Sequence, residues 1–442
     1  MACKVSLQSL LATLIAISVA NNGNGSAQVA GRCIAYVRPA TRIPSALLHV
    51  VPMPAWEQRK LSEVATFGGG HTPPMADPDN YEDGYVLWVT SQDVKSNYLD
   101  RTTTQITEKG AKELTLYPAG SLVMVTRSGI LRHTLPVAEL RKPSTVNQDI
   151  RVILPQGECC GEWLLQFFIS HNKELLLEFG KTGTTVESVD FGKIKDMLLY
   201  MPSTVEQQQI GDFFAKLDSL ITLHQRKYDK LVILKKSMLE KMFPKDGESV
   251  PEIRFAGFTD PWEQRKASEV FQIVDDRGHP TLPVLSATQN QGMIYRDDSG
   301  RYIGHDESNE IGYKRVLPGD FVVHLRSFQG GFAHSQYEGI TSPAYTVFRA
   351  KEPTSHSDRF WKHWFMSEHF IAGLSTVTYG IRDGRSISVD EFMNTFLAFP
   401  AVEEQAAISR LFDYLDDLIT LHQRKLELLQ NIKKSLLDKM FV

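Results

Sequence analysis

The chain has 442 residues, 42% of them hydrophobic and 23% charged, with a formal net charge of −4 at pH 7. It is long enough for two or three domains, each with its own core. Its charge excludes a uniformly cationic nucleic-acid-binding protein, although local basic patches still permit DNA binding. The four cysteines form no CxxC motif, and no histidine cluster accompanies them. We therefore expect no structural zinc or other bound metal, no disulfide framework, and a cytoplasmic location.

The first 53 residues do not resemble the rest of the chain. Leu10–Ala20 is apolar and follows Lys4, a pattern found in the hydrophobic part of a secretory signal, although it is too short to span a membrane. The segment after it shows no period. We expect residues 1–53 to be an atypical extension, disordered or translated from an incorrect start, and a secretory signal is the alternative.

Two repeats organise the remainder. Residues 205–243 align without a gap with residues 403–441, at an offset of 198, and both contain the string LITLHQRK. A second repeat opens each half, as AWEQRKLSEV at 55–64 and PWEQRKASEV at 261–270. The sequences between opener and closer barely match. Constant ends around variable inserts indicate a duplicated scaffold that presents two different binding domains.

Both inserts have the pattern of a mixed α/β domain. Apolar runs bounded by Gly, Pro and Asn predict strands, and apolar residues at helical spacing predict a helix after them. The expected strands are 85–90, 121–126 and 150–154 in the first insert and 321–325 and 346–349 in the second. The expected helices are 161–177 and 358–374. Short similarities, such as Arg127–Ser128 with Arg326–Ser327, indicate that the inserts are diverged copies of one α+β domain.

Each closing repeat is predicted to form one long helix. Apolar residues recur with a 3.5-residue period over four or more heptads, which indicates a coiled coil. A helix of about 38 residues spans roughly 57 Å, so its stripe needs a partner helix, and the other copy is the nearest candidate. Antiparallel pairing would give the monomer a pseudo-two-fold axis. The expected interface comprises Leu217, Ile221, His224, Tyr228, Leu231, Leu415, Ile419, His422, Leu426 and Leu429, and the stripe of the first helix continues through Leu234.

His224 and His422 occupy equivalent positions within this stripe. We expect hydrogen-bonded residues that help to fix the register of the two helices. A pH switch or a metal-binding pair is the alternative.

The predicted division of the chain follows these elements. We expect the extension over 1–53, a first recognition domain over 54–202, a first spacer helix over 203–247, a second recognition domain over 248–400, and a second spacer helix over 401–442. The predicted fold class is therefore mixed α/β, with two similar α+β domains joined by two long antiparallel helices.

Polar loops after apolar strands are the best candidates for contact with nucleic acid. Phosphates are bound by Arg, Lys, Ser, Thr and exposed backbone amides, and base edges by Arg, Asn, Gln and hydroxyl groups. Arg127 and Arg326 carry most weight because they recur at matching places in divergent copies. Taken singly, each loop reads equally well as an ordinary polar turn. The predicted DNA-binding residues are Thr72, Arg127, Ser128, Arg132, His133, Gln148, Thr184, Arg326, Ser327, Gln329, Tyr379, Arg382 and Arg385.

A search for catalytic motifs finds little. There is no phosphate-binding loop of the G-x-x-x-x-G-K-[ST] type, no H-E-x-x-H and no G-x-S-x-G. Asp79, Asp93 and Lys95 mimic the spaced acids and lysine of a metal-dependent nuclease. The second half has no counterpart, so a nuclease centre is the weaker interpretation.

Taken together, these motifs resemble the specificity (S) subunit of type I restriction–modification systems. The resemblance covers about 54–442. It is carried by the two WEQRK openers, the lead-in PEIRFAGFTD at 251–260, the phrase WVTSQDV at 88–94, the Pro-x-x-x-Glu-Gln starts of the closers, and the twin LITLHQRK helices. The first half lacks the RFAGFTD lead-in.

The resemblance implies a subunit without catalytic groups of its own. Each insert would read one half of a bipartite, asymmetric target in double-stranded DNA, and the helices would fix the unread spacer. At roughly 57 Å they exceed the roughly 34 Å of one duplex turn. Two methyltransferase and two restriction subunits would assemble on the constant segments. S-adenosylmethionine, ATP and Mg²⁺ would belong to those partners, with none bound by this chain.

Two other functions compete with this interpretation. One is a coiled-coil scaffold whose terminal domains bind proteins, and the other is a free-standing nuclease using Asp79, Asp93 and Lys95. Salt-dependent, sequence-selective DNA binding by the complex favours a DNA reader over a protein scaffold. Cleavage by the purified chain with Mg²⁺ alone would favour the nuclease.

Overall fold

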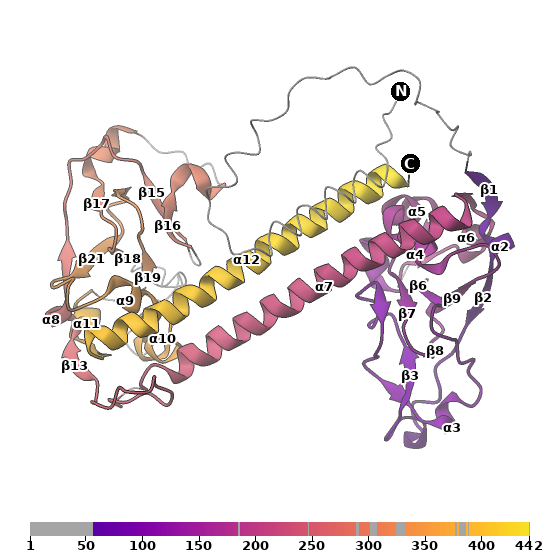
Figure 1. The fold of residues 1–442 in the computed structure, drawn as a ribbon, viewed down its shortest axis with the longest axis horizontal. Helices are drawn as coiled ribbons and strands as arrows, with labels where there is room; N and C mark the ends of the chain where they lie inside the picture. Colours follow the sequence, from indigo (N-terminus) through magenta and orange to yellow (C-terminus); the bar gives the residue numbers. More distant parts are fainter. Residues whose placement is uncertain are drawn as a thin grey trace, which may run out of the picture. The chain divides into compact units, whose positions relative to one another are not determined.

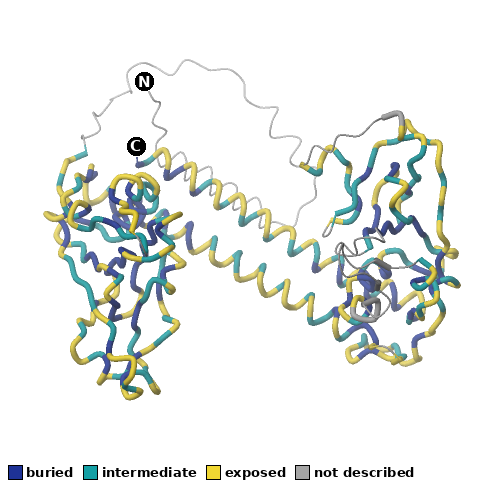
Figure 2. The backbone as a smooth tube through the Cα atoms, turned by 180° about the vertical axis from the view of Figure 1, so that it is seen from behind, coloured by how far each residue is buried: buried dark blue, intermediate teal, exposed yellow. Residues whose placement is uncertain are grey.

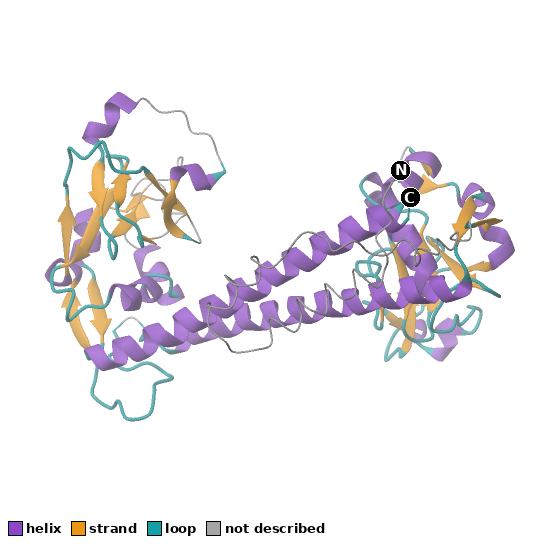
Figure 3. Ribbon diagram, turned by 45° about the horizontal axis from the view of Figure 1, so that its top comes forward, coloured by secondary structure: helices purple, strands orange, loops and turns teal. Residues whose placement is uncertain are grey.

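The computed structural model describes residues 56–183, 186–245, 247–288, 291–300, 307–323, 332–375, 378–379, 386–387 and 389–441. The predicted N-terminal extension lies outside these residues. The described chain mixes helices and strands throughout (Figure 3), so the predicted mixed α/β class is confirmed.

The first insert is built on a five-stranded sheet of order β2-β9-β6-β7-β4. Its strands are β2 (Ala65–Gly69), β9 (Ile150–Pro155), β6 (Leu122–Val125), β7 (Val137–Leu140) and β4 (Tyr98–Leu99). A smaller sheet contains β5 (Gln105–Ile106), β3 (Val86–Val89) and β8 (Thr145–Val146). Every residue of β6 and β7 is buried, as expected for strands covered on both faces. Short elements complete the domain: α2 (Leu61–Val64), α3 (Glu108–Ala111), η1 (Pro78–Asn80) and η2 (Gly129–Arg132).

The second insert repeats this plan on a main sheet of four strands instead of five. Its main sheet has the order β14-β21-β18-β19, from β14 (Phe271–Val274), β21 (Thr346–Ala350), β18 (Phe321–Val323) and β19 (Phe332–His334). This order matches β2-β9-β6-β7, which supports the prediction that the inserts are diverged copies. The further elements are α8 (Ala267–Val270), β15 (Leu285–Thr288), β16 (Gly292–Tyr295), β17 (Lys314–Val316), β20 (Gly339–Thr341), η3 (Arg296–Ser299) and η4 (Glu307–Gly312).

Two helices, rather than one, follow each main sheet. The predicted helix 161–177 is divided into α4 (Gly161–Ser170) and α5 (Asn172–Phe179), because His171 leaves helical geometry at ψ 14°. The predicted helix 358–374 is likewise divided into α9 (Asp358–Trp364) and α10 (Glu368–Ser375). A hairpin and a short helix follow in each copy: β10 (Gly180–Lys181), β11 (Ser188–Val189) and α6 (Phe191–Asp196), then β22 (Thr378–Tyr379), β23 (Ser386–Ile387) and α11 (Val389–Asn394).

The repeated openers pair with the strands that precede the closing helices. β1 (Glu57–Lys60) runs antiparallel to β12 (Leu198–Met201), and β13 (Glu263–Lys266) runs antiparallel to β24 (Phe396–Phe399). Segments that are far apart in sequence thus form one two-stranded ribbon at the base of each insert. This pairing places each repeated opener beside the start of its closing helix.

The closing repeats form two long helices, α7 (Thr204–Lys241) and α12 (Val402–Met440), which lie side by side (Figure 1). Facing contacts pair low numbers on one helix with high numbers on the other, so the helices run antiparallel. The first insert packs α4 on the first half of α7, and the second packs α9 on α12. Buried residues concentrate in the inserts and at the helix ends, while much of the helix pair is exposed (Figure 2).

Candidate DNA interface and helix pair

Three polar loops of the first insert meet at one end of its main sheet. Gly69 at the end of β2 is paired with Arg151 near the start of β9, and Val125 at the end of β6 is paired with Ile150. The loops after β2, after β6 and before β9 are therefore neighbours. The Thr72 hydroxyl donates to Oε1 of Gln148 over 2.6 Å, and the Thr126 amide donates to the carbonyl of Asp149 over 2.8 Å. The structure thus brings Thr72, Gln148 and the segment beginning at Arg127 together.

Glycine is required in the first of these loops because two backbone segments approach closely. A Cβ atom on Gly70 would lie 1.8 Å from the carbonyl oxygen of Val146. The Tyr117 hydroxyl donates to the Gly69 carbonyl and accepts from its amide. Gly69 and Gly70 therefore allow the close backbone packing that positions the following residue Thr72.

Arg127 is an exposed cation of this surface. Its side chain is exposed, and it makes no hydrogen bond or ion pair with the residues that the structure describes. Its backbone bridges to Ser188, and the Ser128 amide donates to the Glu187 carbonyl over 3.1 Å, so hairpin β10–β11 supports the loop. The Ser128 hydroxyl begins η2 by accepting from the Ile130 amide. Arg127 is thus held by its backbone while its guanidinium remains free for a phosphate or a base edge.

Arg132 and His133 lie on the same loop but differ from Arg127. Arg132 pairs with Glu187, and the hydrogen bond from Arg132 lowers the pKa of the Glu187 carboxyl. This pairing compensates the charge of Arg132 before any ligand arrives. His133 is exposed. Arg132 is therefore a weaker candidate than Arg127 for contact with DNA.

Arg151 is a candidate that the sequence did not single out. It is exposed, and its Nη1 atom lies 2.4 Å from the place where a Cβ of Gly69 would stand, so its side chain crosses the glycine strand. The signal was the alternation of Ile150–Pro155, in which Arg151 is the outward position between buried neighbours. Arg151 adds a second cation to the loop end of the sheet.

Most candidates of the second insert lie outside the described residues. These are Arg326, Ser327, Gln329, Arg382 and Arg385, together with Thr184 in the first insert. Tyr379 is described only in its backbone, where β22 pairs it with Ser386. The frame around them is equivalent to the first insert, since β22 and β23 begin 198 residues after β10 and β11. Their role in DNA binding remains a prediction.

The facing surfaces of α7 and α12 combine apolar and polar residues. Leu217 and Leu415 are buried, and His224 and His422 meet with their Nδ1 atoms 2.8 Å apart. Ile221, Tyr228, Leu231, Ile419, Leu426 and Leu429 are partly buried. Leu234 was expected in the stripe, but it is 42% exposed, and its neighbour Lys235 pairs instead with Asp416 at 2.5 Å. The prediction for Leu234 was wrong because it did not consider a lysine as an interface residue.

The histidine pair predicts a dependence of stability on pH. Burial, followed by the opposing imidazole and nearby lysines, lowers the pKa of His224, and burial lowers the pKa of His422. The unfolded chain, with a histidine pKa of about 6.5, then binds more protons than the folded chain as the pH falls below that value. We expect the thermal midpoint to fall between pH 7.5 and pH 5.5. The fall should be smaller in a His224→Leu, His422→Leu double variant, and an equal fall in both proteins would contradict this role.

Two glutamines fasten the helix starts to the inserts. Gln207 donates to the Pro202 carbonyl over 2.9 Å and accepts from the Cys160 amide over 2.9 Å. Gln405 donates to the Pro400 carbonyl over 2.9 Å and accepts from the Ser357 amide over 3.0 Å. Each buried amide thus joins the start of a long helix to the start of α4 or α9. This geometry explains the recurrent Pro-x-x-x-Glu-Gln motif.

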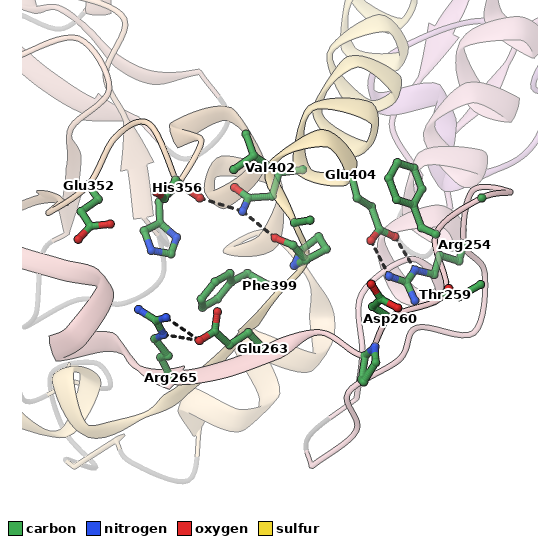
Figure 4. Close-up of a pocket in the computed structure, with 17 residues that line it drawn as sticks. Arg254, Thr259, Asp260, Glu263, Arg265, Glu352, His356, Phe399, Val402 and Glu404 are labelled. Carbon is green, nitrogen blue, oxygen red and sulfur yellow. Dashed lines mark hydrogen bonds and ion pairs between the residues drawn. The ribbon is translucent and has the colours of Figure 1, made fainter.

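A pocket of about 470 Å³ lies where the second lead-in meets the start of α12 (Figure 4). Arg254 donates two hydrogen bonds of 2.7 Å to Glu404, and Arg265 pairs with Glu263. The bidentate pair fastens the lead-in to α12. Asp260 and Glu352 also line the pocket, so its carboxylates outnumber its two guanidinium groups.

The residues that mimic a nuclease centre have structural partners. Asp93 accepts hydrogen bonds from the amides and hydroxyls of Thr90 and Thr103. Burial alone would raise the pKa of Asp93, but these bonds lower it overall. Asp79 pairs with Lys109 at 2.9 Å. These carboxylates serve to shape the loops between Thr72 and Lys109.

One group of possible metal ligands, His363, Asp413 and Asp416, occurs within the described part of the chain. Lys235 lies 2.5 Å from Asp416, and Lys362 lies 3.5 Å from both carboxylates. Two ammonium groups therefore already occupy the positions beside the acids.

In the same described residues, we find no helix long and apolar enough to cross a bilayer.

Comparisons with known proteins agree on one family. Residues 53–232 match the sequence model of the "Type I restriction modification DNA specificity domain". The specificity subunit of the Escherichia coli type I restriction enzyme EcoR124I/EcoR124II is 29% identical over 186 residues, covering 39% of this chain and 46% of that relative. The MjaVIII specificity subunit of Methanocaldococcus jannaschii is 22% identical over 408 residues, covering 87% and 91%.

Other matches differ in coverage. The MjaIX specificity subunit of M. jannaschii is 29% identical over 190 residues, covering 42% of each chain. The chain thus aligns with less than half the length of two of these relatives. The crystal structure of an S subunit from M. genitalium superposes with a TM-score of 0.54 at 10% identity, over 88% of this chain and 96% of that one, and shows a shared fold. The family model, these relatives and the shared fold together support a type I restriction–modification S subunit.

Proposed function

We propose that this chain is the sequence-reading subunit of a type I restriction–modification complex. Each insert reads one half of a bipartite, asymmetric site in double-stranded DNA, and α7 with α12 forms the antiparallel spacer between them. The observation that carries the proposal is the duplication itself. Two main sheets share one strand order on two antiparallel helices, while their loop sequences differ. Because the two sheets share a strand order but differ in their loops, each insert can read a different half-site. The helices between them can hold the two half-sites at one separation.

The loop end of the first sheet supplies the chemistry for one half-site. Arg127 and Arg151 offer exposed guanidinium groups, and Thr72 and Gln148 offer a hydroxyl and an amide. Guanidinium and amide groups form the paired hydrogen bonds that distinguish bases in the major groove. Thr72 and Gln148 hold one another in the free protein, so a base edge would replace that bond on binding.

We place catalysis and its cofactors in partner subunits. Two methyltransferase and two restriction subunits would assemble on the constant segments, and S-adenosylmethionine, ATP and Mg²⁺ would be bound there. One surface supports a helical partner. Tyr414, Leu421 and Leu428 recur every seven residues on α12 and are 61%, 44% and 52% exposed. Apolar side chains at heptad spacing are suited to packing against another helix.

We expect Arg127→Ala to change methylation at one half-site and leave the other unchanged. The loss of one bidentate contact costs about 1–3 kcal/mol of discrimination at one position. The test is methylation mapping of a strain that expresses this chain with its methyltransferase. Arg101→Ala is the matched control, because the Arg101 side chain is 79% exposed. Arg101 follows β4, which lies at the edge of the main sheet opposite β2.

The methylation map of the Arg127→Ala variant shows whether the two inserts read separate half-sites. A relaxed motif in one half only supports separate readers. A uniform loss of methylation at both halves, with a protein of unchanged thermal midpoint, would contradict separate half-site readers.

A further inference from the structure

Three polar contacts cross the interface of the two long helices. Lys433 on α12 lies 2.6 Å and 2.9 Å from the two carboxylate oxygens of Asp218 on α7. Lys235 on α7 lies 2.5 Å from Asp416 on α12. His224 and His422 meet between them. We refer to these three contacts as the polar rungs.

The rungs are arranged symmetrically about the histidine pair. Asp416 and Lys433 stand 198 residues after Asp218 and Lys235, which is the offset of the sequence repeat. Seventeen residues separate the aspartate from the lysine on each helix, or roughly 26 Å along the axis at about 1.5 Å per residue. Each histidine stands six residues after the aspartate of its own helix. The two outer rungs are thus one contact repeated by the duplication.

The outer rungs are shielded from solvent. Asp218 is 6% and Lys433 8% exposed, while the side chains of Lys235 and Asp416 are 13% and 30% exposed. A shielded charge that loses its partner is strongly disfavoured, because water no longer compensates it. These residues therefore penalise any arrangement in which aspartate and lysine do not meet.

The apolar stripe alone does not distinguish the observed register from its neighbours. Apolar residues repeat by heptads on both helices, so a slip of seven residues again places apolar positions opposite one another. After such a slip in one direction, Asp218 faces Met440 and Lys433 faces Gln225. In the other direction, Asp218 faces Leu426 and Lys433 faces Gly211. Either slip leaves Asp218 and Lys433 opposite uncharged residues. The polar rungs therefore favour the observed register over both shifted ones.

Each outer rung also holds an insert on the helix pair. The Asp218 carboxylate accepts a hydrogen bond from Asn97 over 3.0 Å, and Tyr98 and Gln166 donate to it over 3.4 Å. These three residues belong to the first insert. In the second insert, Lys362 donates to Asp416 over 3.5 Å. The same carboxylates that fix the helix register thus fix the inserts to the helices.

We infer that the Asp218–Lys433 and Asp416–Lys235 rungs, with the histidine pair between them, determine the length of the unread DNA spacer. The inference rests on the proposed function as a bipartite DNA reader. A slip of one heptad displaces one helix by about 10.5 Å along the other, which corresponds to about three base pairs. Spacer length is part of the specificity of such a reader, so these residues are specificity determinants although they lie between the two helices and not in the candidate DNA surface.

Apolar contacts at the helix ends contribute to the same register but are less selective. Phe243 stacks on Phe412 with ring centroids 5.8 Å apart, and Phe441 lies 6.3 Å from Phe214. An apolar ring displaced by a slip can pack on another apolar surface, because such contacts have no fixed partner. At the shifted positions, the buried Asp218 and Lys433 would instead face uncharged residues of the other helix. The test must therefore remove charge while retaining apolar burial.

The experiment compares methylation maps of variants expressed with the methyltransferase subunit. In the rung variant, Asp218, Lys433, Lys235 and Asp416 are each changed to Leu, which removes both members of each charge pair, while Lys362 keeps its contact with Asp413. The matched control changes Lys236 and Glu368 to Leu, since this exposed pair lies one residue from Lys235 and joins α7 to α10 at 2.8 Å. We expect one spacer in the native protein and the control. The rung variant should add sites with spacers about three base pairs longer or shorter, with both half-sites unchanged.

A single unchanged spacer in the rung variant overturns the inference and leaves the proposed function intact. Absence of bipartite methylation by the native protein overturns the proposed function instead. If the rung variant does not methylate, the register is measured in the purified full chain. Spin labels at Leu223→Cys and Leu428→Cys, after replacement of native cysteines by alanine, report it because both positions are exposed and level with each other across the helices. Two distance populations in the rung variant support the inference, and one population identical to the native protein overturns it.

Discussion

Replacing Lys433 with Ala is expected to lower the free energy of unfolding by about 3–5 kcal/mol. The substitution leaves the Asp218 carboxylate in a site that is 6% exposed, without the ammonium group that now lies 2.6 Å away. Hydrogen bonds from Asn97, Tyr98 and Gln166 remain, but they do not neutralise the charge. Urea unfolding monitored by circular dichroism measures the loss.

The neighbouring residue provides a control for this prediction. Lys434 is exposed, so Lys434→Ala should change the free energy of unfolding by less than about 0.5 kcal/mol. An Asp218→Leu, Lys433→Leu double variant should be more stable than Lys433→Ala, because it removes both charges. Equal effects of Lys433→Ala and Lys434→Ala would show that the buried ion pair does not contribute as described.

Lengthening both long helices by one heptad is expected to lengthen the DNA spacer by about three base pairs. The change duplicates Ile221–Lys227 in α7 and Ile419–Lys425 in α12, two segments with the same sequence ITLHQRK. The added turns lie between the outer rungs on each helix. Asp218 can therefore still meet Lys433, and Lys235 can still meet Asp416. Methylation mapping should show both half-sites unchanged at the longer separation.

A variant with the duplication in only one helix tests the pairing register of the helices independently of the length of the helix pair. It prevents both outer rungs from forming together, because 24 residues on one helix then face 17 on the other. We expect this variant to lose stability and methylation. A longer helix pair that still methylates only at the native spacer would show that the helices do not set the separation.

The long helices were predictable because their signals are local and repeated. The apolar period and the offset of 198 residues define α7 and α12 to within a few residues at each end. Strands were also located closely where apolar runs are flanked by turn residues, as for β6 and β9. The break at His171 escaped prediction because the apolar spacing continues across it.

The histidine pair of the helix interface was foreseen, but its charged contacts were not. Lys235 stands in a lysine-rich stretch of α7, and only the structure of the helix pair shows that it meets Asp416. A signal was present nonetheless. Asp218 with Asp416 and Lys235 with Lys433 are identical between two copies that otherwise differ at many positions. Identity at buried polar positions of a repeat is thus more informative than charge density along one helix.

The candidate DNA surface was predictable in part. Arg127, Thr72 and Gln148 follow apolar strands, and an antiparallel sheet brings such loops to a common end. The bond between Thr72 and Gln148 joins residues 76 positions apart, which no local pattern reveals. Arg151 was missed because it lies within a strand and not in a loop.

Methylation mapping of a strain that expresses the native chain with its methyltransferase tests the central claim most directly. We predict one motif made of two different half-sites, separated by a spacer of fixed length whose bases vary freely. An uninterrupted motif, or two half-sites found at many separations, would contradict the account in which paired helices hold two readers at one distance.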